Sequence, residues 1–575
     1  MVDRSELHPG GDYSGWHLAE LDLESIDLTN ANLSGANLRD TNLSHATLIG
    51  VNLRGANLSR AKLENANLCG AIACRANFKN SNLSHANLTK ADLTGTKLRE
   101  AILYKAEMSN ARLERANLTR ASLQQVNLSD ANLSGAVLVG ASLRSANLCY
   151  SHGRGASLRR ADLSDINLTG AEFYGADLSG ANLSRAILDR ANLRRTRLRG
   201  AKLNAARLVE TKLSGSDISY ADLAHIVIHN ATIKGAGLQG TKLDYAELLN
   251  TNLSRCDMSS ASFTKASLKK VRLSKSEFIC ADFCEAELDT ISLIGANLAA
   301  TNFQNATFRQ AELMRANLNS AKLQGCELYE ADLSRAYLGG ADLSHATLVR
   351  ADLRGANLLA ARLHETILCH AYLQRTKLID ADFDSADLRA TGFTGANLTR
   401  TKLNTPRVTN AQFGGNLGLE PAQIDSLIQK GAMFIGDVLP PIDDVMEEFR
   451  ADFRERFEDL RELLLKFSDA IETLNQTFDD LTEDGYSIPS SEREQLGRLI
   501  TLFQDQTSQF ESNIEEYKVE ILSAELSDWT AEDFSAEHIQ ICEQIDRLIN
   551  HIRITQAMTR GLLMDHDSYS APGYG

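Results

Sequence analysis

A five-residue pattern of small, polar, large apolar, polar and polar positions runs through most of the chain. In the stretch ANLSGANLRDTNLSHATL, the large position is filled by Leu33, Leu38, Leu43 and Leu48, and a small residue stands two positions before each. An α-helix turns the chain by about 500° in five residues, and a strand alternates its faces, so neither keeps these leucines together. The pattern therefore predicts a chain that bends once per repeat, with two side chains pointing inward and three outward.

The large position keeps its phase from Leu18 to Phe413, which is eighty repeats without an insertion. Leu, Phe, Ile, Met or Val fills 78 of these positions, and Ala73 and Gly153 are the two exceptions. An interior of this kind alternates large and small side chains, because two large ones per side would overfill it.

A longer period appears in the last residue of every fourth repeat, from Gly35 to Gly415. All 20 residues of this set are Gly, Arg or Lys. The last residues of the other three repeats in each group of four make three further sets, and only 20 of their 60 residues are Gly, Arg or Lys. The sequence therefore predicts coils of twenty residues with four sides each. We call the basic members of this set the Arg/Lys edge: Arg75, Arg115, Arg195, Arg255, Lys275, Arg315, Arg335 and Arg375.

The twenty-residue period also predicts which side chains stack in the interior. Phe263, Phe283 and Phe303 are twenty residues apart, so we expect them to form a ladder on one inner side. Phe173 stands one coil after Gly153, and we expect it to fill the space that the glycine leaves.

The segments ANLSGANLRD, ADLSGANLSR and ADLRGANLLA resemble the pentapeptide-repeat family, whose repeat is written A(D/N)LXX. The resemblance covers residues 16–413. It implies a β-solenoid, a right-handed quadrilateral β-helix of about 20 coils, which at ~4.8 Å per coil is roughly 95 Å long. It also implies a bacterial or cyanobacterial, cytoplasmic protein without enzymatic activity.

The ends of the repeat suggest caps, and the chain divides into four parts. Trp16, Leu21 and Ile26 are bulky where alanine is usual, so we expect them to close the first coil. After the repeat, GLEPAQIDSLIQKGAMF predicts a short closing helix with Pro421 near its start. The predicted parts are a tail and cap at 1–15, the solenoid at 16–415, a cap with a short helix at 416–439, and an acidic α-helical domain at 440–575.

In the last part, apolar residues between Phe453 and Leu481 alternate spacings of four and three, which is a coiled-coil pattern of about four heptads. Two further amphipathic helices follow it, and the final residues are expected to be disordered. Short connections favour an antiparallel three-helix bundle. A homodimer formed through a parallel coiled coil of the first helix remains an equal alternative.

Charge separates the two main parts. Residues 1–415 carry 48 Lys and Arg against 41 Asp and Glu, whereas residues 416–575 carry 12 against 34, and the whole chain has a net charge of −15. The basic excess is densest in residues 51–215, with 25 against 12. No apolar run approaches the ~20 residues that cross a bilayer, so no membrane span is expected.

Motifs for chemistry are weak, and we nominate no catalytic, cofactor-binding or metal-ligating residue. GAGLQG at 235–240 matches a dinucleotide-binding fingerprint in letters, but Ala236 and Leu238 are ordinary inward positions and no helix begins there. His45, His85, His225 and His345 share one corner set but lie at least two coils apart, too far to share a metal. The nine cysteines form no zinc or disulfide pattern, and Cys256 and Cys326 take the small inward position.

The sequence thus favours a non-enzymatic scaffold whose rigid faces and helical domain bind unidentified protein partners. Some pentapeptide-repeat proteins are gyrase-interacting DNA mimics, and this alternative is disfavoured by the basic charge of the repeat. A third hypothesis is that the Arg/Lys edge binds nucleic acid or an acidic partner. Nucleic acid is the less expected of these, because aromatic platforms are absent and the basic residues are intermittent along the chain.

Overall fold

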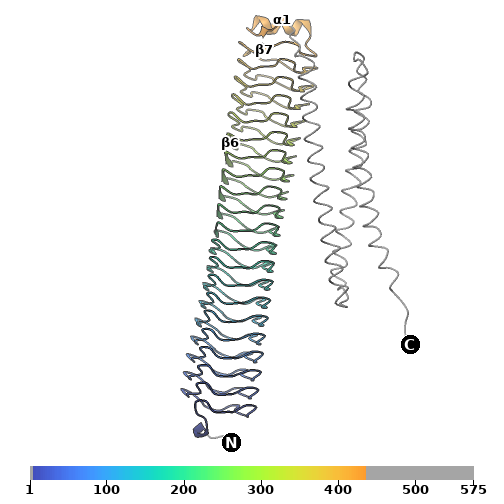
Figure 1. Cartoon of the computed structure of the whole chain (residues 1–575). Helices are drawn as coiled ribbons and strands as arrows, with labels where there is room; N and C mark the ends of the chain where they lie inside the picture. Colours follow the sequence, from blue (N-terminus) through green and yellow to red (C-terminus); the bar gives the residue numbers. More distant parts are fainter. Residues whose placement is uncertain (1–3, 436–575) are drawn as a thin grey trace, which may run out of the picture. The chain divides into compact units, whose positions relative to one another are not determined.

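A computed structural model describes residues 4–435, which form a stack of similar coils (Figure 1). The helical domain, the coiled coil and the homodimer predicted for residues 440–575 lie outside the described residues and stay predictions. The described chain begins with the 3₁₀ helix η1 (Arg4–Glu6) and continues directly into the stack.

Parallel bridges join residues that are twenty positions apart along the whole stack. The first pairs Asp12 with Asn32, and the last pairs Asn397 with Leu417. On each side the backbone N–H of one coil donates to a carbonyl of a neighbouring coil, as from Leu33 to Asn52 at 2.7 Å. Four pentapeptides therefore make one turn, which confirms the twenty-residue period and the β-solenoid.

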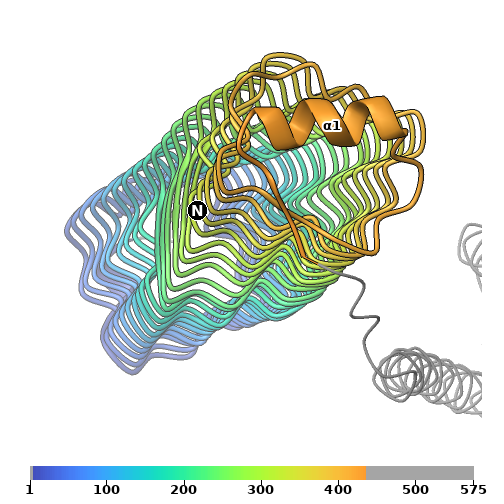
Figure 2. The ribbon, with the colours of Figure 1, turned by 90° about the horizontal axis from the view of Figure 1, so that it is seen from above.

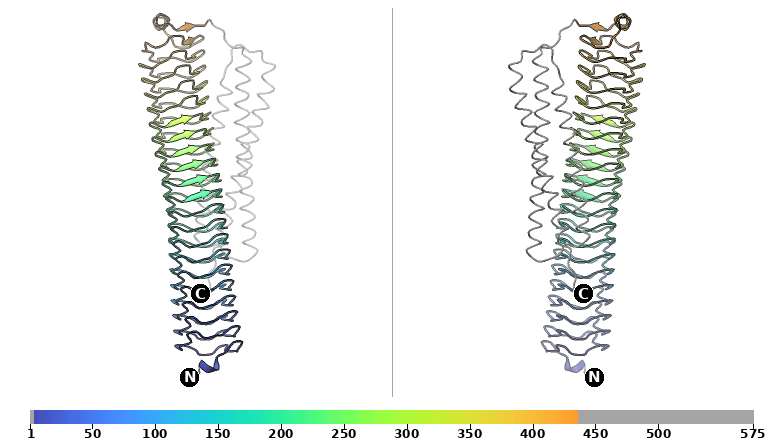
Figure 3. Two further views of the ribbon diagram at one scale, coloured as in Figure 1. Left: turned by 90° about the vertical axis from the view of Figure 1, so that its left-hand side faces the viewer. Right: turned by 90° about the vertical axis from the view of Figure 1, so that its right-hand side faces the viewer.

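Along one side of the stack the pairing is regular enough to form a six-stranded parallel sheet (Figure 3). Each strand pairs with the next in a register of twenty residues, for example Leu208 with Ile228. The central residue of each strand points inward and is buried. The strands are β1 (Arg207–Val209), β2 (Val227–His229), β3 (Glu247–Leu249), β4 (Ser267–Lys269), β5 (Glu287–Asp289) and β6 (Thr307–Arg309).

Every corner of the solenoid is made by a residue in the left-handed conformation. Each fifth residue from Gly10 to Arg400 has a positive φ, and most of them are not glycine. The left-handed conformation costs an ordinary residue roughly 1–2 kcal/mol, which the coil-to-coil hydrogen bonds offset. Because all four corners share this geometry, φ does not explain why one set alone is restricted to Gly, Arg and Lys, and nothing else in the structure does.

The polar residue before each large one supports the corner that follows. The Oδ1 of Asn32 accepts a hydrogen bond from the backbone N–H of Ser34 at 3.2 Å, and the same pairing recurs along the stack. The amide of Asn52 also donates to Asn32 Oδ1 at 3.0 Å, one coil away. This double role explains the preference for Asn and Asp, whose short side chains reach their own turn.

The interior is filled by the large and small positions that the sequence indicates, and nearly all of these side chains are buried. Phe263 stacks on Phe283 with ring centroids 4.4 Å apart, and Phe283 stacks on Phe303 at 5.1 Å, so the predicted ladder is confirmed. Where threonine replaces the small alanine, its hydroxyl donates to a backbone carbonyl, as from Thr41 to Leu18 at 2.9 Å. Buried polar atoms at these positions therefore cost little.

At the N-terminal end, pairing starts slightly before the first leucine of the repeat. Tyr13 already takes the large inward position and is buried, and Trp16 packs on its ring at 5.0 Å. Ile26 is buried, and Leu21 is partly buried against the core. The bulky residues predicted to close the first coil thus do pack at this end.

The C-terminal end is closed by helix α1 (Pro421–Gln429), which lies across the coils in Figure 2. This confirms the short helix with Pro421 at its start. After the helix, β8 (Met433–Phe434) pairs in parallel with β7 (Gln412–Phe413). Phe434 stacks on Phe413 at 5.2 Å, and Phe413 stacks on Phe393 at 5.0 Å, so a second stack of rings, separate from the Phe263 ladder, ends at this cap.

Gly153 and Phe173 form a complementary pair, as the sequence suggests. A Cβ added to Gly153 would lie 2.2 Å from Cε1 of Phe173, so the ring occupies the space of the missing side chain. We expect Gly153→Ala to lower the free energy of unfolding by roughly 1–3 kcal/mol, because the ring must move. The change in the midpoint of chemical denaturation measures it.

The matched control is the double variant Gly153→Ala with Phe173→Leu. It removes the overlap and restores leucine at a position where leucine is usual. Its loss of stability should be smaller than the sum of the two single losses. Additive losses would show that the two residues do not share this space.

Candidate interaction surfaces

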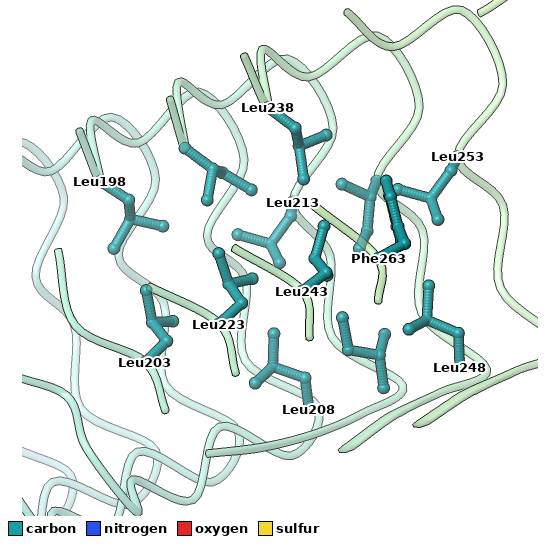
Figure 4. Close-up of a pocket in the computed structure, with 13 residues that line it drawn as sticks. Leu198, Leu203, Leu208, Leu213, Leu223, Leu238, Leu243, Leu248, Leu253 and Phe263 are labelled. Carbon is teal, nitrogen blue, oxygen red and sulfur yellow. The ribbon is translucent and has the colours of Figure 1, made fainter. Parts of the chain in front are cut away.

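The interior of the described coils is packed with apolar side chains. A cavity of about 10 Å³ lies among thirteen apolar side chains, among them Leu208, Leu243 and Phe263 (Figure 4). Its lining carries no polar surface, and its volume is about that of one water molecule. We therefore look for function on the outer surface.

Residues with metal-binding or nucleophilic side chains are dispersed or buried. No group of three or more His, Cys, Asp or Glu side chains within residues 4–435 is arranged to hold a metal ion. Cys256 and Cys326 lie at small inward positions, and each thiol donates to a carbonyl, of Ile233 at 3.1 Å and of Phe303 at 2.8 Å. Burial raises the pKa of Cys256 to about 11 and that of Cys326 to about 12, so both thiols are protonated and inert near neutrality.

The segment GAGLQG is part of the solenoid. Ala236 and Leu238 are buried inward residues, and Gly235 and Gly240 are corners with positive φ. No helix begins within it, so the interpretation of this segment as ordinary repeat is confirmed.

The Arg/Lys edge follows one corner of the solenoid, and its members have the positive φ of all corners. The side chains of six of the eight basic residues lean towards the next coil. The Cγ atoms of Arg115 and Arg335 lie 3.6 Å from the site that a Cβ would take on Gly135 and Gly355. In six of the eight cases the corner residue twenty positions further on, in the next coil, is a glycine. The aliphatic part of the basic side chain covers this glycine. Whether this edge binds a partner stays a prediction.

The fold also gathers basic residues that the sequence analysis counted only along the chain. We call the side of the solenoid between the Arg/Lys edge and the following corner the basic side. It holds fifteen of the twenty-five Arg and Lys of residues 51–215. The signal was available in the sequence as residue position within the twenty-residue period. The bridges show that residues twenty positions apart stack in successive coils, so these basic residues lie together on one surface.

The family model of pentapeptide repeats matches the chain in twelve stretches between residues 22 and 404. Together these stretches cover more than half of the chain. The chain belongs to the pentapeptide-repeat family.

Solved structures of other pentapeptide-repeat proteins resemble parts of this one. HetL, involved in heterocyst differentiation regulation in the cyanobacterium Nostoc sp., is 33% identical over 38% of this chain and 90% of HetL, with a TM-score of 0.22. QnrB1, a plasmid-mediated fluoroquinolone resistance protein, is 22% identical over 34% of this chain and 93% of its own, with a TM-score of 0.19. The search of curated proteins gave no match. Because the TM-scores are low, the assignment rests on the family model.

Within residues 4–435 of this pentapeptide-repeat protein, we find no helix with the length and apolar character that a bilayer crossing requires.

The corner geometry predicts how the Arg/Lys edge tolerates substitution. Arg115 has a φ of 57°, a conformation that glycine adopts freely and a β-branched residue resists. Arg115→Gly should leave the free energy of unfolding within about 1 kcal/mol, and Arg115→Val should lower it by roughly 1–2 kcal/mol. Denaturation midpoints compare the two, and equal effects would contradict the role of φ.

The cysteines of the pentapeptide repeats should differ in reactivity. At pH 8 a maleimide should label exposed Cys280 in the folded protein, whereas Cys256 and Cys326 should stay unlabelled until the protein unfolds. Their raised pKa keeps them in the thiol form at this pH, and burial excludes the reagent. Mass spectrometry of the digested protein locates the label, and labelling of all three in the native state would contradict the packing.

Proposed function

We propose that this pentapeptide-repeat protein is a non-enzymatic scaffold that binds protein partners on the outside of its solenoid. The observation that carries the proposal is the uninterrupted stack of coils over an apolar interior. An enzyme of ordinary design holds its substrate in a concave pocket with a few convergent polar groups. The repeat here presents long, regular sides on which partners can be arranged at fixed spacing.

We assign partner binding or dimerisation to residues 440–575, whose acidic, heptad-patterned sequence differs from that of the repeat. The repeat count supports a rod of about twenty coils, roughly 95 Å long at ~4.8 Å per coil. The cytoplasm is the proposed location, consistent with cysteines that form no disulfide pattern. Both the intramolecular bundle and the homodimer satisfy this role.

A DNA-mimicking function finds less support. A mimic of duplex DNA needs a negative outer surface, whereas residues 1–415 of this chain are net basic. Binding of an acidic partner by the Arg/Lys edge is the second candidate, and the alignment of its basic residues along one corner favours it.

The scaffold role is tested by comparing the full chain with a chain that ends at residue 439. Both are immobilised and exposed to extract of the source cells, and their masses in solution are measured by light scattering. We expect a defined partner to be retained by the full chain and lost from the shortened one. Equal capture by the two would contradict the role of residues 440–575, and a mass twice that of one chain for the full protein alone would identify the dimer.

A further inference from the structure

The basic side of the solenoid is strongly and locally charged. Over nine successive coils it carries sixteen Arg and Lys against four Asp and Glu. The opposite side of the solenoid is formed by nine segments that recur every twenty residues from 24–30 to 184–190. These segments carry five Arg and Lys against seven Asp and Glu. The nine segments of the basic side are 34–40, 54–60, 74–80, 94–100, 114–120, 134–140, 154–160, 174–180 and 194–200.

The few carboxylates on the basic side are paired with arginines. Asp177 lies 3.5 Å from Arg197 and 4.0 Å from Arg159. Asp40 lies 3.0 Å from Arg39 and also pairs with Arg60, whose hydrogen bond lowers the pKa of this carboxyl. The other two are paired as well, Glu100 with Arg99 at 3.2 Å and Glu114 with Arg112 at 3.5 Å. The remaining charge on this side is therefore of one sign.

Most of the basic residues keep their charge available to a ligand. Eleven of the sixteen make no ion pair with any carboxylate of residues 4–435, and these are Arg54, Arg75, Lys79, Lys97, Arg115, Arg120, Arg154, Arg160, Arg194, Arg195 and Arg199.

Aromatic rings hold some of the guanidinium groups in place. The guanidinium carbons of Arg154 and Arg195 lie 5.7 and 5.9 Å from the centre of the Tyr174 ring, and that of Arg199 lies 5.1 Å from Tyr220. Cation–π contacts of this kind orient arginine and reduce the entropy it loses on binding. Because Tyr174 is already engaged by two arginines, it is not free to stack on an unpaired base.

The basic side has little apolar surface. The large apolar side chains exposed between residues 34 and 200 all lie on other sides, and these are Ile49, Ile72, Ile102, Tyr150 and Ile187. The buried centre of a protein–protein interface is usually apolar and poor in charge. Interfaces with nucleic acid are polar and strongly positive, and they depend on the phosphate backbone.

We propose that the basic side binds the phosphate backbone of a nucleic-acid duplex without regard to base sequence. Nine rows at ~4.8 Å extend for about 38 Å, close to one turn of a duplex. Fourteen of the sixteen basic residues are arginine, whose planar fork pairs with phosphate oxygens. Between residues 34 and 200 the chain has no helix that could enter a groove, so contacts go to the backbone. This site belongs to the solenoid and goes beyond the proposed scaffold role, which does not depend on it.

The test uses the full chain and a fluorescently labelled 20-base-pair duplex, with binding followed by anisotropy at about 50 and 200 mM salt. The net charge of −15 opposes non-specific attraction, so binding at low salt points to a local basic surface. The variant Arg54→Ser, Arg154→Ser, Arg194→Ser and Arg199→Ser removes four charges. Serine stands at the equivalent positions of neighbouring coils, namely Ser34, Ser59, Ser134, Ser179, Ser214 and Ser219, so the fold should accept it.

We expect this variant to bind the duplex at least tenfold more weakly and with a salt dependence reduced by about three counterions. The matched control is Lys62→Ser, Lys202→Ser, Lys242→Ser and Lys322→Ser, which removes the same charge from the adjacent side. Serine also stands at this position, at Ser122, Ser142 and Ser262. The control should retain most of the affinity, and circular dichroism should show that both variants keep the fold.

Several results would overturn the proposal. These are no duplex binding at 50 mM salt, equal loss in the two variants, or tighter binding to anionic lipid vesicles or to a polyglutamate peptide than to the duplex. Tighter binding to a single strand would also overturn it, because the phosphates of a duplex would then not be the ligand. None of these results changes the capture of a protein partner by residues 440–575, so the two proposals fail separately.

Discussion

The backbone hydrogen bonds that pair each coil with the next, in a register of twenty residues, are the constraint on which the rest of the solenoid depends. They run from Asp12 to Leu417, and every inward, outward and corner position takes its place from them. A single inserted residue would turn each following leucine away from the interior, as a register slip does in any sheet. This explains why eighty repeats keep their phase without an insertion.

The same bonds allow the corners to accept many residue types. A positive φ at every fifth residue is carried by Arg, Lys, Asn, Asp, His, Tyr and others. Each corner residue is bonded to the next coil, as at Gly35, whose N–H donates to the carbonyl of Arg54 at 2.9 Å, so the stack and not the side chain offsets the backbone cost. Apart from the Asn and Asp positions that support the corners, the outer surface is therefore little constrained by folding. Its charges can be arranged for a partner without loss of the interior.

Much of the fold could be predicted from the sequence, because eighty repeats share one pattern of inward and outward positions. The Phe263 ladder and the pairing of Gly153 with Phe173 followed from spacing, and the helix followed from the position of Pro421. The start at Tyr13 was not predicted. Its ring fills the large position, and its hydroxyl lies where a Cβ on Gly11 would be, so this coil departs from the usual small-and-large pattern. The conformation of the corners was also missed, because only one of the four sets is rich in glycine.

The candidate site was harder to predict, because binding depends on a side of the solenoid and not on the order of residues along the chain. Over the repeat, 48 basic residues against 41 acidic ones suggest a weak and even charge. A ligand at the surface responds mainly to charges within about 8 Å at physiological salt, so the net charge of the whole repeat has little weight there. Sixteen Arg and Lys against four Asp and Glu on one side, and five against seven on the opposite side, give two surfaces of different charge. A chain with a net charge of −15 can therefore still present one side of its solenoid on which basic residues outnumber acidic ones four to one.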